Sequence, residues 1–570
     1  MENIPGLAIY NLPPSPPRWD KVGVFYISFC AVWTTLLFAG MAFCWFHRHN
    51  TILRLRGLPL SFSAITFLHL YWMLGQLVYP IGVSFPTVLA YDIQYFFMGI
   101  WFPLGIALFH ASNSRFLHVA KLQRQFTNPE IRKSTRCNVS ETSWLSRLRN
   151  MDYTKRIMMF IGLGMVVQIF LNVGMWLACI KYHPTFGIPG TEIRGATLME
   201  QLTDLGRGWE WWPSVLWQVA WTWIVAPIMI WRAWGIRDTM GWRTQTIGCC
   251  ISNLHATPMF LIAIYAPSFA SVNMYFAPSQ WIHLSVFMFE IFTVFVPAGQ
   301  VIKQMIVTKR IISSDTMWEI ESQTDTLKGS TSIDRKLSSS KSLAEKGQAI
   351  DYCDEAMGER LMTMSALNQV LDQDPGPLQD FSALSDFSGE NIAFLTRTAR
   401  WKESWTAQPT HEHNLQVYNR ALAIYADFIS PRDAEFPLNL SSLELKHLED
   451  IFEKPTRILC GEARVNPALP FELPLSAGSG SGREPQVERV SDRARYTGRI
   501  SDDFGPGVFD AAESHIKYLV LTNTWPKFVK EMQQRRRSSE TSRSEFSAAS
   551  DTTLASRVSN KMSHLIDSFI

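Results

Sequence analysis

An uncharged run, VGVFYISFCAVWTTLLFAGMAFCWF, occupies residues 22–46 of the 570-residue chain. About 20 apolar residues in an α-helix cross the hydrocarbon core of a bilayer, so this run is long enough to span a membrane. It is also too long for the apolar part of a cleaved signal peptide, and a proline-rich segment precedes it. We therefore expect this run to remain in the chain as the first membrane anchor.

Six further apolar stretches of similar length follow before residue 305. The seven expected spans are Val22–Phe46, Leu58–Tyr79, Val88–Phe109, Ile157–Ile180, Pro213–Trp231, Ile247–Tyr265 and Trp281–Ile302. Pro227 and Pro258 interrupt the fifth and sixth spans, and membrane helices tolerate proline where neighbouring groups satisfy the freed carbonyl. The sequence predicts a seven-helix transmembrane bundle over residues 22–305.

Lysine and arginine concentrate in the loops after the first, third, fifth and seventh spans, and most densely between Arg115 and Arg156. Because cytoplasmic loops carry the excess of positive charge, residues 1–21 are expected outside the cell and the C-terminal half in the cytosol. We expect a multi-pass protein of the plasma membrane, although an internal membrane would show the same bias.

Several polar side chains fall inside the expected spans, and three of them are candidate functional groups: Glu290, Asp92 and His255. Ionisable groups inside a membrane are costly and usually face the bundle interior. Glu290 is either an interhelical switch or ligand counter-ion, or a protonated carboxyl bonded to a neighbouring helix. Asp92 lies near the outer end of its span, where water could reach it. The segment 209–212 (WEWW) is favoured as an interfacial aromatic belt over a ligand surface.

The second half of the chain is polar and predominantly helical in pattern. Residues 306–350 are Ser-rich and predict a linker. A helical domain is expected over 351–532, with a disordered insert at about 454–507 and a Ser/Arg-rich tail at 533–570. An apolar stripe at helical spacing predicts one of its helices, and it comprises Tyr418, Ala421, Leu422, Tyr425, Phe428 and Ile429. Ser388 is a predicted N-cap, and Ser441 with Glu444 predicts a capping box. Leu438 and Leu440 are expected to be buried on either side of Asn439. In the tail, Ser538 and Ser539 follow three arginines, which suits either a basophilic kinase or a solvated charge run.

Composition excludes several classes of function. The net charge of +3, without a basic stripe between aromatics, argues against nucleic-acid binding. The eight cysteines lack metal-ligand spacing and are expected to be free thiols, so neither a metal nor another cofactor is expected. The sequence contains no nucleotide-binding or hydrolase motif in a suitable context. We therefore expect that the chain is not an enzyme with catalytic residues of its own.

Five short motifs follow one another in the second half. They are Phe381-Ser382 with 386–395 (DFSGENIAFL), 423–429 (AIYADFI), 438–440 (LNL), 509–513 (FDAAE) and 525–529 (WPKFV). In this order they resemble the RGS domain, the regulator of G-protein signalling. With seven spans ahead of it, the chain resembles the seven-transmembrane RGS proteins, and the stretch 208–213 (GWEWWP) favours a fungal type.

The resemblance implies an all-α fold, a seven-helix bundle followed by a cytosolic RGS-type domain. It also implies a GTPase-activating, negative regulator whose partner is Gα in its GTP or transition-state form. Residues that match the family's Gα-contacting positions are Glu390, Asn391, Asn439, Leu519, Asn523 and Lys527. Asn523 stands where the family usually has Asp and Lys527 where it usually has Arg, which weakens a bidentate ion pair to a neutral–cation contact.

A second interpretation remains open. Seven spans, two of them broken by proline, also suit a transporter or sensor whose RGS-like domain serves only as a Gα scaffold. The bundle lacks the N-P-x-x-Y and D-R-Y motifs of rhodopsin-type receptors. Membrane lipids and a small-molecule ligand are its other expected partners.

Overall fold

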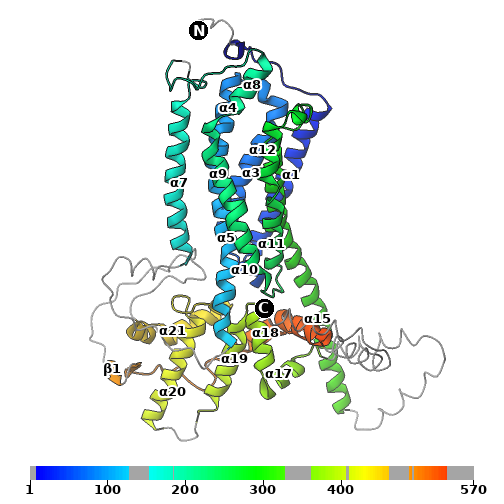
Figure 1. Ribbon diagram of the computed structural model, residues 1–570. Coiled ribbons are helices and arrows are strands. Elements are labelled where there is room, and N and C mark those ends of the chain that lie inside the picture. Colours follow the sequence, from blue (N-terminus) through cyan, green and yellow to red (C-terminus); the bar gives the residue numbers. More distant parts are fainter. Residues whose placement is uncertain are drawn as a thin grey trace, which may run out of the picture. The chain divides into compact units, whose positions relative to one another are not determined.

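The computed structural model describes residues 8–127, 153–183, 185–327, 361–405, 410–460, 487–490 and 493–535, and most of them are helical (Figure 1). The chain divides into two compact units. The first combines Met1–Ile306 with Pro375–Ile516, and the second combines Val307–Asp374 with Lys517–Ile570. The first unit thus combines the bundle with part of the predicted RGS-like domain.

The seven predicted spans are confirmed as helices long and apolar enough to cross a membrane, so this is a multi-pass membrane protein. Their bounds are Lys21–Phe46, Leu58–Ser84, Thr87–Thr127, Thr154–Ala178, Leu198–Trp234, Trp242–Tyr265 and Gln280–Ser313. The third is the longest and extends well beyond the predicted Phe109. It therefore continues past the apolar run into a polar segment that ends at Thr127.

Several spans consist of more than one helical element. The first two spans contain α1 (Lys21–Phe46) and α3 (Leu58–Ile81), joined by the short α2 (Thr51–Arg54). The third contains α4 (Thr87–Phe96), η3 (Phe97–Trp101), α5 (Phe102–Gln123) and η4 (Arg124–Thr127), and the fourth is α7 (Tyr153–Ala178). The rest are α8 (Leu198–Gly206), α9 (Trp212–Val219), η6 (Ala220–Val225), α10 (Ala226–Trp234), α11 (Trp242–Asn253), α12 (Ala256–Tyr265), α13 (Ala270–Asn273), α14 (Gln280–Glu290), η8 (Ile291–Phe295) and α15 (Val296–Leu327).

Prolines explain where the spans are interrupted. A proline lacks an N–H and its ring clashes with the carbonyl four residues earlier. Pro103, Pro227 and Pro297 each follow a wider π-turn, η3, η6 and η8 respectively, which accommodates that clash within a continuous helix. In the sixth span the helix instead ends at Asn253 and restarts at Ala256, just ahead of Pro258.

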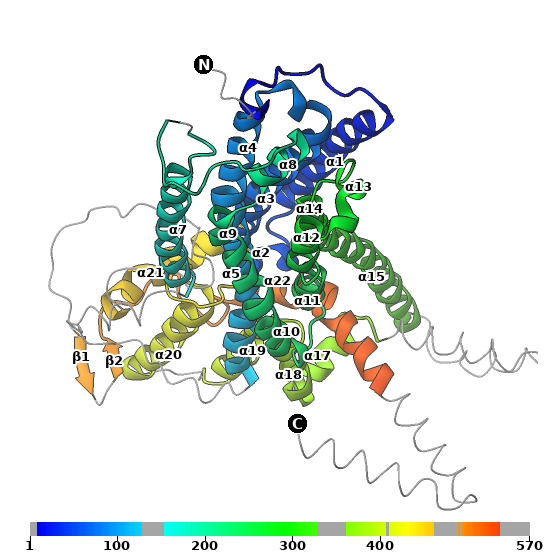
Figure 2. The same ribbon diagram turned by 45° about the horizontal axis from the view of Figure 1, so that its top comes forward.

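The core of the bundle lies around α3 and α5. In the most apolar window of the third span 61% of residues are buried, against 22% in the first and fourth spans. Phe109 of α5 stacks on Phe289 of α14 with ring centroids 4.2 Å apart. Helix α7 stands at the edge of the bundle in both views (Figures 1 and 2) and exposes large apolar residues such as Phe170. Its apolar surface is what a lipid-facing helix requires.

The first unit also contains a second group of helices. These are α18 (Gly376–Leu384), α19 (Gly389–Lys402), α20 (His411–Ile424), η10 (Tyr425–Ile429), α21 (Ser442–Cys460) and the beginning of α22 (Asp510–Leu519). The predicted apolar stripe from Tyr418 to Ile429 is buried throughout. The predicted capping box also forms, since the Ser441 and Glu444 side chains each accept a backbone N–H from the other residue. Trp401, Phe452 and Phe509 form an aromatic centre among these helices.

The insert predicted at 454–507 is ordered at both ends. Helix α21 continues to Cys460, and β1 (Val487–Val490) pairs with β2 (Arg493–Tyr496) as an antiparallel two-stranded sheet, a departure from an all-α fold. Asn419 fixes the hairpin, because its side-chain amide donates to the Tyr496 carbonyl at 2.9 Å and accepts from the Tyr496 N–H at 2.8 Å. The glycine- and serine-rich run within the insert lies outside the described residues.

In the second unit, α15 continues as helix to Leu327, where the sequence predicted a linker. Its other elements are α17 (Met364–Gln373), the end of α22, η11 (Val520–Thr524) and helical residues up to 535. The Trp525 indole N–H donates to the Leu361 carbonyl at 2.6 Å, which ties the helical end to the segment before α17. Ser538 and Ser539 lie outside the described residues.

Candidate functional site

Three residues of the predicted Gα-contacting set belong to the first unit. Glu390 and Asn391 occupy the first turn of α19, and each is 8% exposed. Asn439 lies in the loop before α21 and is partly exposed, whereas its neighbour Leu438 is buried and its N–H donates to the Phe428 carbonyl at 2.8 Å. This loop is therefore held from both sides, by Phe428 and by the capping box of α21.

The beginning of α19 is capped by another helix. Ser388 occupies the N-cap position, as predicted, but its hydroxyl makes no capping bond and donates to Asp386 at 3.0 Å. The first N–H of the helix, that of Gly389, donates to the side-chain oxygen of Gln123 at 3.1 Å. The amide nitrogen of Gln123 donates to the Glu390 carboxylate at 2.9 Å. A residue at the end of α5 thus supplies the contacts that a helix N-terminus needs.

The loop before Asn439 contacts the membrane half as well. Arg54 of α2 donates to the Pro437 carbonyl at 2.9 Å, and Gln125 of η4 donates to the Glu435 carboxylate at 2.6 Å. Phe126 of η4 packs edge-on against Phe436, with ring centroids 6.0 Å apart. Figure 1 shows α5 reaching the group that contains α18 and α19.

A third membrane-side loop contacts the turn between α18 and α19. The Thr239 hydroxyl donates to the Asp386 carboxylate at 2.5 Å, and the Thr239 N–H donates to the Ser385 carbonyl at 3.0 Å. Phe387 in this turn has φ +49°, a conformation that side chains other than glycine adopt rarely. Its ring is buried and lies edge-on to Phe116 of α5, so burial against α5 helps to hold the strained backbone.

Burial changes the acidity of Glu390. Desolvation raises the pKa of its carboxyl from 4.5 to about 7, and the Gln123 hydrogen bond opposes this rise. Arg54 also lowers the pKa through its positive charge, while the negative charge of Asp386 raises it. The carboxyl therefore exchanges its proton near neutral pH in this environment.

The remaining predicted contacts, Leu519, Asn523 and Lys527, belong to the second unit. The Lys527 ammonium donates to the Asn523 side-chain oxygen at 2.8 Å, one turn of helix away. This is the neutral–cation contact expected from the departure from Asp and Arg. Asn523 is buried and Leu519 is half-buried.

Inside the bundle, Glu290 is fully buried and paired. Its carboxylate lies 2.9 Å from His69 Nδ1 of α3 and accepts from the Trp33 indole of α1. His69 Nε2 in turn lies 3.0 Å from the Thr34 hydroxyl. Glu290 of α14 thus connects α1 and α3 through its carboxylate.

The other two intramembrane candidates are less connected. Asp92 is half-buried and accepts from the Trp176 indole at 2.8 Å. His255 lies at the break between α11 and α12, and its buried Nε2 has no hydrogen-bond partner among the described residues. The structure therefore does not bring Asp92, His255 and Glu290 into one hydrogen-bonded cluster within the described part of the chain.

The residues of the WEWW segment (209–212) lie in three different environments. Trp209 and Trp212 are each 43% exposed, in keeping with an aromatic belt. Glu210 is buried and forms an ion pair of 2.5 Å with buried Lys181, which sequence reasoning missed. Trp211 lines a small open cavity of about 20 Å³ together with Arg207, Tyr265 and neighbouring apolar residues.

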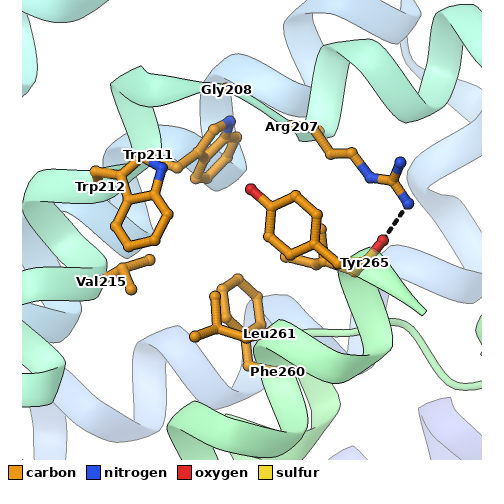
Figure 3. A pocket seen from close by; sticks show the side chains of 10 residues that line it. Arg207, Gly208, Trp211, Trp212, Val215, Phe260, Leu261 and Tyr265 are labelled. Carbon is orange, nitrogen blue, oxygen red and sulfur yellow. Dashed lines mark hydrogen bonds between the residues drawn. The ribbon is translucent and has the colours of Figure 1, made fainter.

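Figure 3 shows how the cavity is arranged. The Tyr265 ring lies between Arg207 and the two tryptophans, with its hydroxyl directed towards them. The guanidinium of Arg207 turns away and donates to the Ile264 carbonyl. The indole N–H of Trp211 is buried without a partner among the described residues. This aromatic surface with a spare donor offers a contact for the oxygen-bearing edge of a small molecule, and does not enclose one.

Comparisons with protein-family models, with curated proteins and with solved structures find no match to this chain.

Proposed function

We propose that the chain is a receptor-like membrane regulator of a heterotrimeric G protein. Its helical region after the bundle accelerates GTP hydrolysis by Gα and so ends the signal. The N-terminus faces outward and the helical region faces the cytosol of a cell whose plasma membrane holds the bundle. Its partners are Gα in the transition-state form, membrane lipids and a small ligand, for which the cavity beside Trp211 is the candidate site.

The observation that carries this proposal is the agreement between motif positions and packing. The large apolar residues of the first, second and fourth motifs are core residues, and they include Phe381, Ile392, Phe394, Tyr425, Phe428 and Phe509. The polar motif residues Glu390, Asn391 and Asn439 occur at a helix start and in a loop. Buried apolar and terminal polar positions are what a helical domain needs to fold and to offer a binding surface.

The chemistry needs no catalytic residue from this chain. Gα carries its own arginine and a glutamine that orients water. A domain that holds the mobile switch segments in their transition-state geometry lowers the barrier by pre-organisation. The Asn439 amide, which can donate and accept without a charge, would lie beside that glutamine and its water.

Selective binding tests the proposal directly. The full chain in lipid nanodiscs is immobilised and exposed to Gα loaded with GDP, with GDP and aluminium fluoride, or with a non-hydrolysable GTP analogue. The aluminium fluoride form mimics the transition state, and we expect it to bind at least tenfold more tightly than the GDP form. Equal binding of all three forms would contradict the proposed function.

A further inference from the structure

The contacts at the start of α19 and in the loop before α21 come from three separate segments of the bundle. Arg54 precedes α3, Gln123 and Gln125 end the third span, and Thr239 lies between α10 and α11. Their partners lie in two segments, 385–390 and 435–437. These two segments carry Glu390 and adjoin Asn391 and Asn439, which are the residues of this unit assigned to Gα.

The Glu390 side chain cannot contact Gln123 and Gα at the same time. Glu390 is 8% exposed and its carboxylate accepts from buried Gln123. The neighbouring residue Gly389 packs closely against η4, because a Cβ on Gly389 would lie 2.8 Å from the Cβ of Phe126. The membrane half therefore approaches the start of α19 too closely for a second protein to reach Glu390.

We propose that the loops of the membrane half clamp the RGS-like region in an inhibited state, in which Arg54, Gln123 and Thr239 cover the surface that contacts Gα. This inference rests on the proposed function. Release requires the end of α5 to separate from α19, and it exposes Glu390 and Asn391 together.

Two features suit a clamp that opens. Glu390 is a carboxyl buried against a neutral amide. The cost of its desolvation offsets part of the gain from its contacts, so the free-energy difference between the docked and released states is small. Helix α5 is also the central helix of the bundle and continues directly into η4. A shift of α5 caused by a ligand is transmitted along a rigid helix to Gln123, and a small bias between two states changes their populations strongly.

The test uses the full chain in nanodiscs and two readouts. Gln123→Glu places a carboxylate against Glu390, which repels the docked state, and Gln123→Ala removes both hydrogen bonds without adding charge. Lys121→Ala is the matched control, since Lys121 is exposed on the same helix end. Hydrogen exchange of the Gly389 amide reports docking, and binding of Gα loaded with GDP and aluminium fluoride reports access to the surface.

We expect Gln123→Glu to lower the protection of the Gly389 amide at least tenfold and to strengthen Gα binding at least tenfold, with Gln123→Ala intermediate and Lys121→Ala like wild type. If wild type already binds Gα, and the Gln123 variants lose protection of the Gly389 amide without binding Gα more tightly, the clamp is overturned. The proposed function then still stands. Unchanged protection in both Gln123 variants overturns the docked contact itself. Loss of protection without Gα binding by any variant overturns the proposed function, and the clamp with it.

Discussion

Gln123 at the end of α5 donates a hydrogen bond of 2.9 Å to Glu390 in the first turn of α19, and both side chains are buried. The two residues lie 267 positions apart in the chain. One belongs to a helix of the bundle and the other to the second group of helices in the first unit. This contact joins the bundle to the motif that resembles the RGS domain.

The Glu390 carboxyl makes docking depend on pH. Its pKa is about 7 when docked and returns towards 4.5 when released into water. The docked state therefore binds the proton more tightly, so docking is strongest at low pH and weakens as the pH rises to about 7. Arg54 opposes this effect and Asp386 adds to it.

We expect the protection factor of the Gly389 amide, corrected for intrinsic exchange, to rise as the pH falls from 8 to 6. Glu390→Gln carries a side chain that does not titrate, and its protection factor should stay flat over the same range. A wild-type profile as flat as that of Glu390→Gln would contradict the assignment of the titration to Glu390.

The buried pair of Lys181 and Glu210 predicts a large effect on stability. Glu210→Ala leaves a buried ammonium without its counter-charge, and breaking a buried ion pair in this way costs about 3–5 kcal/mol. Thermal unfolding of the purified chain in detergent should shift clearly downward. The double variant Lys181→Met with Glu210→Leu removes both charges and should recover most of the loss. If the double variant is no more stable than Glu210→Ala, the destabilisation has another cause.

The orientation can be tested on intact cells. Residues 313–347 follow the seventh span, and the charge bias places them in the cytosol. A protease added outside should spare them, while cleavage should occur after the cells are permeabilised. Cleavage from outside before permeabilisation would reverse the orientation or remove one span from the membrane.

Asn439→Ala should impair the action on Gα without destabilising the fold. Asn439 is partly exposed in a loop, so its replacement should change the free energy of unfolding by no more than about 0.5 kcal/mol. Loss of one pre-organised contact to the transition state costs roughly 3 kcal/mol, or on the order of a hundredfold in rate. Circular dichroism melts control for folding. The buried neighbour Leu438 gives the contrast, since Leu438→Ala should destabilise the fold by about 2–5 kcal/mol.

The sequence predicted the features that depend only on residues within a single helix. Hydropathy and length located all seven spans, and spacing located the buried stripe from Tyr418 to Ile429. The Ser441 capping box was equally readable, because its two partners lie three residues apart. Leu440, expected to be buried beside Asn439, is only partly so.

Contacts between distant residues could not be predicted in the same way. Gln123 is a polar residue at the end of a helix, and no periodicity distinguishes it from a solvated one. Glu210 was assigned to an aromatic belt, and only its closeness in space to Lys181 makes the two a buried pair. The insert was assigned by composition, which missed Tyr496 and its bonds to Asn419.

The most direct test of the account is single-turnover GTP hydrolysis by Gα in the presence of the full chain in nanodiscs. Wild type, Gln123→Glu, and Gln123→Glu combined with Asn439→Ala are compared at equal concentration. We predict that Gln123→Glu accelerates hydrolysis strongly and that adding Asn439→Ala removes most of the acceleration, on the order of a hundredfold. If no variant accelerates hydrolysis by any Gα of the source organism, or if Asn439→Ala has no effect in the folded Gln123→Glu chain, this region does not act on Gα as proposed.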